Sequence, residues 1–274
     1  MSCNIIQHGI DGFGHQLHGL FSTIILHNIK NYNFRGDLFI NKNFHFAYVS
    51  KKEGLELQNY MIESINYFIK SNIINYEIIN SHIHSHEIYK IPTNYDKNTI
   101  YSIDNAYYFE KIGLSEEEKI LHNNNINNFK KFFIENKYLP SNRLEKNNIV
   151  IHIRLGDALH DDRRNELLDF NKKVIKLLDK LIIDYPNYKI YIHSNGNPNF
   201  IDKNKYNFIF YPESTPLMQV LSDLIHSKIF VCGSSALSKI SAFLGNHEKI
   251  IIPDDTKNSM PKNCIKMSDY INLI

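Results

Sequence analysis

Tryptophan is missing from this chain of 274 residues, and cysteine occurs only three times. Cys3, Cys232 and Cys264 are odd in number and far apart, which argues against a disulfide framework and is typical of a reducing compartment. No apolar run approaches the roughly 20 residues of a membrane helix, and the first eight residues lack the pattern of a signal peptide. We therefore expect a cytoplasmic protein without an integral membrane segment.

Neither sign of charge dominates. The 31 basic and 29 acidic residues give a net charge of +2 and are scattered, whereas nucleic-acid-binding proteins gather Lys and Arg into a patch or stripe. We expect no nucleic acid partner. Because the chain is longer than one core usually spans, two domains are predicted, residues 1–145 and 146–274, with the polar stretch 140–148 as the linker.

Metal-ligating residues are not arranged in a recognisable site. His82, His84 and His86 alternate along one segment, but they lack a carboxylate or cysteine partner at a metal-binding spacing. We interpret them as solvated loop histidines and expect no metal.

The first half alternates strand and helix patterns. The Ser-Glu-Glu-Glu run from Ser115 is a capping-box start with acidic residues in the first helical turn. The predicted strands are 4–7, 37–41, 44–49 and 98–103, and the predicted helices are 16–29, 55–70 and 114–137.

The second half alternates more cleanly and predicts a doubly wound α/β domain of nucleotide-binding character. Thr215 is a candidate N-cap, with Pro216 at the first helical position. The predicted strands are 149–153, 189–193, 207–211, 229–232 and 249–252, with helices over 164–183, after Pro216 and after Ser235.

Gly12 and Gly14 permit a tight turn at the start of the first predicted helix. The N–H groups and dipole at such a helix start attract phosphate or carboxylate. A Gly-x-Gly pair by itself favours a structural turn over a ligand loop.

The apolar run 149–153 reads as a strand buried on both faces. Side chains alternate along a strand, so His152 and Arg154 point the same way, at the carboxyl end where open α/β sheets bind ligands. The residues leave two interpretations open: an anion site, or an ion pair of Arg154 with Asp157 or another carboxylate.

Three consecutive strand ends of the second half carry polar groups. Arg154 offers a charged fork for phosphate, Ser234 and Ser235 offer hydroxyls at a helix start, and Asn195 follows the predicted strand 189–193. This convergence predicts a site for a nucleotide diphosphate. No P-loop, dinucleotide fingerprint or Gly-x-Ser-x-Gly motif is present.

Three blocks carry a family resemblance. Residues 152–157, His-Ile-Arg-Leu-Gly-Asp, resemble the His-x-Arg-x-Gly-Asp signature of the α-1,2-fucosyltransferases and their relatives, the O- and α-1,6-fucosyltransferases. Residues 12–16, Gly-Phe-Gly-His-Gln, are similar to the Gly-x-Gly-Asn-Gln of these enzymes, and residues 218–245 are similar to their helix, strand and Ser-rich loop. The stretch 29–148 shows no match.

The resemblance implies a GT-B fold, two Rossmann-like domains facing a cleft, and metal-independent, inverting transfer of fucose from GDP-fucose to a glycan hydroxyl. It implies that Arg154 clamps the diphosphate and stabilises leaving-group charge. The donor-binding positions that it implies are Gly12, Phe13, Gly14, His152, His193, Ser194, Asn195, Ser234, Ser235 and Ala236. No cofactor is expected beyond the donor.

Inverting transfer needs a base from the facing domain, and the glycine loop offers His15 and Asp11. We favour His15, although a hydrogen bond from His15 to the donor or to the backbone is an equal alternative.

The chain departs from the family pattern at several positions. Leu155 replaces a second arginine, Asn195 stands where many relatives have Asp, and aromatics are replaced at Leu237, Lys239 and Ile240. Linkage and donor base therefore stay open. The alternatives are a GT-B transferase that uses another nucleotide sugar and a non-catalytic glycan- or nucleotide-binding descendant.

Overall fold

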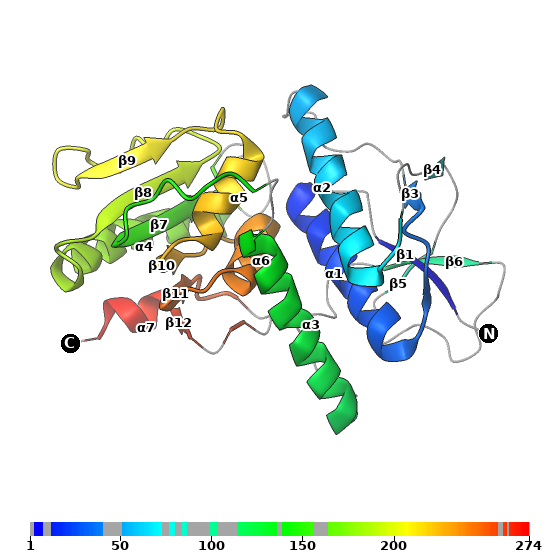
Figure 1. The fold of residues 1–274 in the computed structure, drawn as a ribbon. Coiled ribbons are helices and arrows are strands. Elements are labelled where there is room, and N and C mark those ends of the chain that lie inside the picture. The colour runs from blue at the N-terminus through cyan, green and yellow to red at the C-terminus, as the bar shows by residue number, and fades with distance from the viewer. Residues whose placement is uncertain are drawn as a thin grey trace. The chain divides into compact units, whose positions relative to one another are not determined.

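The computed structural model describes residues 3–7, 12–40, 51–72, 77–79, 84–86, 99–103, 114–135, 139–155, 164–256, 260–261 and 263–273. The chain divides into two compact units, Met1–Phe133 and Ile134–Ile274. Each unit combines helices with parallel strands, so the predicted α/β class is confirmed (Figure 1).

The first unit contains two parallel sheets. Its four-stranded sheet has the order β2-β1-β6-β5, and a separate pair joins β3 to β4. The strands are β1 (Asn4–Gln7), β2 (Asn33–Phe34), β3 (Leu38–Ile40), β4 (Glu77–Ile79), β5 (His84–His86) and β6 (Ile100–Ile103). His84 and His86 thus belong to a strand and not to the loop that we expected, and the predicted strand 44–49 lies outside the described residues.

Three helices, α1 (Phe13–Lys30), α2 (Lys51–Ile69) and α3 (Glu116–Glu135), accompany these sheets. Their apolar faces meet in an aromatic cluster, in which Phe21 stacks on Phe129 at 4.3 Å and Tyr60 meets Phe133 edge-on at 5.1 Å between ring centroids. Because aromatic pairs bury large areas, this cluster ties the three helices together.

The predicted capping box of α3 is confirmed. The Ser115 hydroxyl oxygen accepts the Glu118 N–H at 3.2 Å, and the Glu118 carboxylate accepts the Ser115 N–H at 2.9 Å. The two bonds satisfy donors that a helix start otherwise leaves open.

The second unit is built on one six-stranded parallel sheet with the order β12-β11-β10-β7-β8-β9. When the sheet is read from β9 to β12 and its strands are numbered along the chain from β7, their order is third, second, first, fourth, fifth and sixth, which is the doubly wound order. Its strands are β7 (Asn148–Ile153), β8 (Lys189–Ser194), β9 (Phe208–Tyr211), β10 (Ile229–Val231), β11 (Lys249–Ile252) and β12 (Cys264–Lys266).

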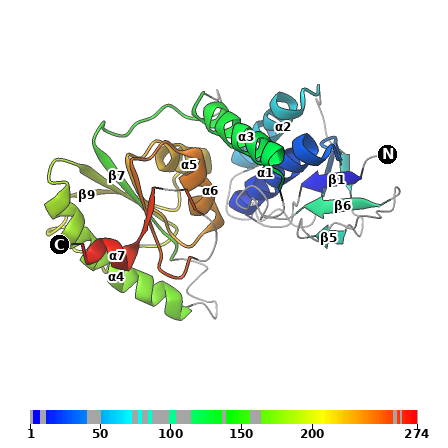
Figure 2. The ribbon, with the colours of Figure 1, turned by 90° about the horizontal axis from the view of Figure 1, so that it is seen from below.

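Helices cover both faces of this sheet (Figure 2). Ile149, Ile151 and Ile153 of β7 belong to a core shared with α4 (Arg164–Asp184) and α7 (Met267–Ile271), whereas Val150 belongs to the opposite core with α5 (Leu217–Ile225) and α6 (Ala236–Leu244). β7 is therefore buried on both faces, as its apolar run predicts.

The predicted start of α5 is wrong by one position. Pro216, not Thr215, occupies the N-cap, and its carbonyl accepts the N–H groups of Gln219 and Val220 at 2.9 and 3.0 Å. Thr215 instead donates its backbone N–H to Pro212 in the preceding turn.

Within the described part of the chain, no helix has the length and apolar character needed to cross a membrane. Cys3, Cys232 and Cys264 are all free thiols.

Candidate functional site

The six-stranded sheet of the second unit has its topological switch point between β7 and β10. The connections that leave these neighbouring strands run in opposite directions, and open α/β sheets bind ligands at the carboxyl ends of such a pair. Arg154 follows β7, and Gly233, Ser234 and Ser235 follow β10. The fold therefore brings the predicted Arg and Ser groups to the same edge of the sheet.

Gly233 is required for the close approach of the two strand ends. A Cβ at this position would lie 2.5 Å from the backbone oxygen of His152 and 3.5 Å from its Nδ1. No real Cβ atom tolerates the first distance, so the β10 turn packs against β7 only because position 233 has no side chain.

Two serines connect His152 to the start of α6. Ser235 caps the helix, because its Oγ accepts the Ser238 N–H at 3.1 Å. Ser238 Oγ lies 2.5 Å from His152 Nδ1 and accepts the Gly233 N–H at 3.2 Å. Ser235 Oγ also lies 3.4 Å from His152 Nδ1. This network fixes the ring of His152 and the position of the helix start.

His152 is a neutral imidazole in this structure. Burial, the neighbouring His193 and Arg154 lower its pKa from 6.5 to about 3, burial being the largest cause. His152 therefore contributes hydrogen bonding and not charge at neutral pH.

The end of β8 is held by its own loop contacts. Asn195 Oδ1 accepts the Leu155 N–H at 2.6 Å, which ties the loop after β8 to the end of β7. Ser194 Oγ accepts the Gly196 N–H at 3.2 Å. These two predicted binding residues thus also shape the loops at the edge of the sheet.

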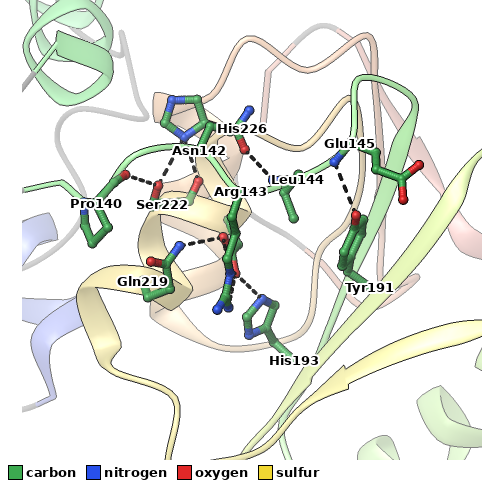
Figure 3. Close-up of polar contacts among 11 residues, drawn as sticks. Pro140, Asn142, Arg143, Leu144, Glu145, Tyr191, His193, Gln219, Ser222 and His226 are labelled. Carbon is green, nitrogen blue, oxygen red and sulfur yellow. Dashed lines mark hydrogen bonds and ion pairs between the residues drawn. The ribbon is translucent and has the colours of Figure 1, made fainter.

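His193, on the other hand, faces a polar network that the sequence did not reveal (Figure 3). Its Nε2 lies 3.0 Å from Oδ2 of Asp223, a fully buried carboxylate on α5. Arg143 donates to the same carboxylate from Nε and Nη2, the latter at 2.6 Å, and Gln219 donates at 2.8 Å. Burial raises the pKa of Asp223, but these contacts outweigh it, so the pKa is lowered and the carboxylate is ionised.

The segment that carries Arg143 is attached to α5 and β8. The Ser222 hydroxyl donates to the Pro140 carbonyl at 2.7 Å, and the Glu145 N–H donates to the Tyr191 hydroxyl at 3.2 Å (Figure 3). Arg143 also places its guanidinium 3.8 Å above the ring of Tyr211. These contacts hold the Arg143 side chain in one place.

The residues predicted at the N-terminal loop belong to the first unit. Gly12 precedes α1, and a Cβ at its position would meet no atom within 4 Å. Phe13 is buried, with its ring 6.3 Å from that of Tyr60, so its side chain is part of the core. Gly14 is buried in the first turn of α1, and His15 is partly buried with its ring 6.2 Å from that of His18.

Several predicted positions fall outside the described residues, namely Asp11, Gly156 and Asp157. The predicted second-unit residues that the structure gathers at the carboxyl edge of the sheet are His152, Arg154, His193, Ser194, Asn195, Ser234, Ser235 and Ala236. Among the residues that are described, no three His, Cys, Asp or Glu side chains form a group suited to a metal ion.

Chemically, the edge combines a permanent positive charge, a capped helix start and fixed hydrogen-bonding groups, a combination that suits an anionic ligand with further polar groups.

Neither a scan against protein-family models nor a search of curated protein sequences finds a match for this chain.

Proposed function

We propose that this protein is an inverting, metal-independent glycosyltransferase of the GT-B type that moves fucose from GDP-fucose to a glycan hydroxyl. The observation that supports the proposal is that Arg154 follows β7 and the Ser234–Ser235 helix start follows β10, the two neighbouring strands at the switch point of a doubly wound sheet.

Each part of this edge has a role in binding a nucleotide diphosphate. The Arg154 guanidinium matches the geometry of phosphate oxygens, and the α6 N-terminus adds the positive end of a helix dipole. The neutral His152 ring adds a polar contact without extra charge. The choice of GDP-fucose rests on the resemblance of residues 152–157 and 218–245 to the fucosyltransferases.

In the proposed reaction the acceptor hydroxyl oxygen bonds to the anomeric carbon of the donor while the bond from that carbon to the diphosphate oxygen breaks. Arg154 stabilises the charge that develops on the leaving diphosphate. The hydroxyl proton passes to a base, for which His15 and Asp11 of the first unit are the proposed candidates.

A thermal-shift panel of GDP, UDP, ADP and CMP tests the donor assignment. We expect GDP to raise Tm most, and we expect GDP-fucose to release free fucose slowly when water replaces the acceptor. A preference for UDP, ADP or CMP would indicate a transferase that uses another nucleotide sugar. GDP binding without any fucose release would indicate a non-catalytic descendant, and no shift with any nucleotide would refute the site.

The base is tested separately. His15→Ala should leave GDP affinity near that of the wild type while fucose transfer collapses. Unchanged turnover would exclude His15 as the base, and Asp11→Asn would then be the next variant to assay.

A further inference from the structure

Asp223 forms a buried anchor beside the proposed donor site. Its carboxylate is fully buried, and it accepts hydrogen bonds from Arg143 Nε and Nη2 and from Gln219 Nε2. A carboxylate with several charge-assisted and neutral donors is strongly localised, because displacement breaks all of the bonds together. The position of Asp223 Oδ2 is therefore well defined.

His193 lies between this anchor and an aromatic ring. Its side chain is only 2% exposed, its Nε2 is 3.0 Å from Asp223 Oδ2, and its ring stacks on Tyr211 at 4.9 Å between centroids and an interplanar angle of 25°. Arg143 covers Tyr211 at 3.8 Å, so one guanidinium holds both the carboxylate and the aromatic ring that contact His193.

The anchor also decides which ring nitrogen of His193 carries a proton. A lone pair on Nε2 would face the ionised oxygen of Asp223 at 3.0 Å, and the two would repel each other. We therefore infer that Nε2 carries the proton, although the angle of this contact is too poor for a hydrogen bond. The other nitrogen, Nδ1, is buried and has no hydrogen-bond partner among the described residues. A buried polar atom without a partner is unfavourable and calls for an explanation, and a ligand group that donates to Nδ1 is one.

The strand register relates His193 to the switch point. His193 on β8 is paired with His152 on β7, the strand that ends at the switch point. An N–H or O–H group of a bound nucleotide is the donor that Nδ1 lacks, and a nucleobase or ribose carries such groups.

We propose that Arg143 and Asp223 are positioning residues that hold His193 in its Nε2–H form, with Nδ1 presented as a hydrogen-bond acceptor to the nucleoside part of the donor. This inference rests on the proposed function, since it takes the ligand at this edge to be a nucleotide.

The tautomer is measured by long-range ¹H–¹⁵N correlation spectra of protein labelled with ¹⁵N-histidine, with the His193 signals assigned by their loss in His193→Gln. We expect the Nε2–H form in the wild type and a mixture of both forms in Arg143→Ala and Asp223→Asn. A wild-type spectrum with the proton on Nδ1 would overturn the proposal.

Binding is measured by calorimetric titration with GDP. Arg143→Ala should weaken GDP binding about tenfold, because Asp223 and Tyr211, which hold the His193 ring, lose their shared contact with the guanidinium. Arg143→Lys should have an affinity between that of Arg143→Ala and that of the wild type. Arg35→Ala is the matched control: Arg35 also pairs with a carboxylate through Nε and Nη2, its side chain is equally exposed at 35%, and it belongs to the first unit. The control should bind GDP like the wild type.

The outcomes separate this inference from the proposed function. GDP binding by the wild type with equal affinity in Arg143→Ala overturns the positioning role and leaves the transferase proposal in place. Absence of nucleotide binding by the wild type overturns both. If Asp223→Asn does not fold, Arg143→Ala and Arg143→Lys carry the test, since Arg143 is partly exposed.

Discussion

Gly233→Ala is the substitution that tests most directly how the switch point is built. The new Cβ would lie 2.5 Å from the His152 backbone oxygen and 3.4 Å from its carbonyl carbon. Neither atom belongs to a flexible side chain. The turn after β10 must therefore move away from β7, and Ser234 and Ser235 must move with it.

The expected cost follows from overpacking. Insertion of one methyl group into a well-packed region costs about 1–3 kcal/mol, and the contact here is with backbone, which relaxes least. For a unit of this size, one kcal/mol shifts Tm by roughly 4 °C, so we expect a fall of roughly 4–12 °C. Displacement of the Ser235 helix start should also weaken nucleotide binding.

Thermal and urea unfolding, followed by far-UV circular dichroism, measure the first effect. Gly12→Ala is the control, because no atom lies within 4 Å of a Cβ at that position. Gly12→Ala should unfold like the wild type. An equal midpoint for Gly233→Ala and Gly12→Ala would refute the close approach of β10 to His152.

Three further predictions concern stability. The pKa of His152 is about 3 in the folded protein and 6.5 ordinarily, so the unfolded chain binds more protons between these two pH values. The free energy of unfolding therefore falls as pH decreases below 6.5, by up to about 1.4 kcal/mol per pH unit. Urea midpoints measured from pH 4 to 7 should depend less on pH in His152→Gln than in the wild type, and an unchanged slope would contradict this. Asp254→Ala removes the acceptor of Lys173 Nζ and of the Ser268 N–H and hydroxyl and should cost about 1–3 kcal/mol, with faster amide exchange in α7; unaltered exchange would show that Asp254 does not hold this helix. Ser115→Ala should cost about 1 kcal/mol in thermal unfolding through loss of the capping box, and a neutral result would exclude a stabilising role for the cap.

Periodicity predicted the elements that bury long apolar faces. β7 reads as a strand from its sequence because both of its faces are buried, and α4 reads as a helix because one of its stripes, including Val174, Leu178 and Leu181, packs into the core. β12 and α7 were not predicted. They are three and five residues long, too short for a periodic pattern, and α7 is tied to the rest of the unit by Asp254.

The strand-end argument located part of the candidate site, because parallel strands end at one edge and their loops must meet there. It anticipated that Arg154 and Ser235 follow strands that end at the same edge of the sheet, but it missed Arg143 and Asp223. Their contact joins positions 80 residues apart, and only the packing of α5 against the sheet brings them together. A charged residue on the buried side of α5, next to Leu224, was the signal available in the sequence.

The role of Arg154 as a diphosphate clamp is tested most directly by calorimetric titration of the wild type and of Arg154→Ala with GDP. The wild type should bind GDP, and the variant should lose detectable binding while its unfolding midpoint stays near that of the wild type. Wild-type affinity in a folded Arg154→Ala protein would contradict the assignment of the diphosphate to this edge of the sheet.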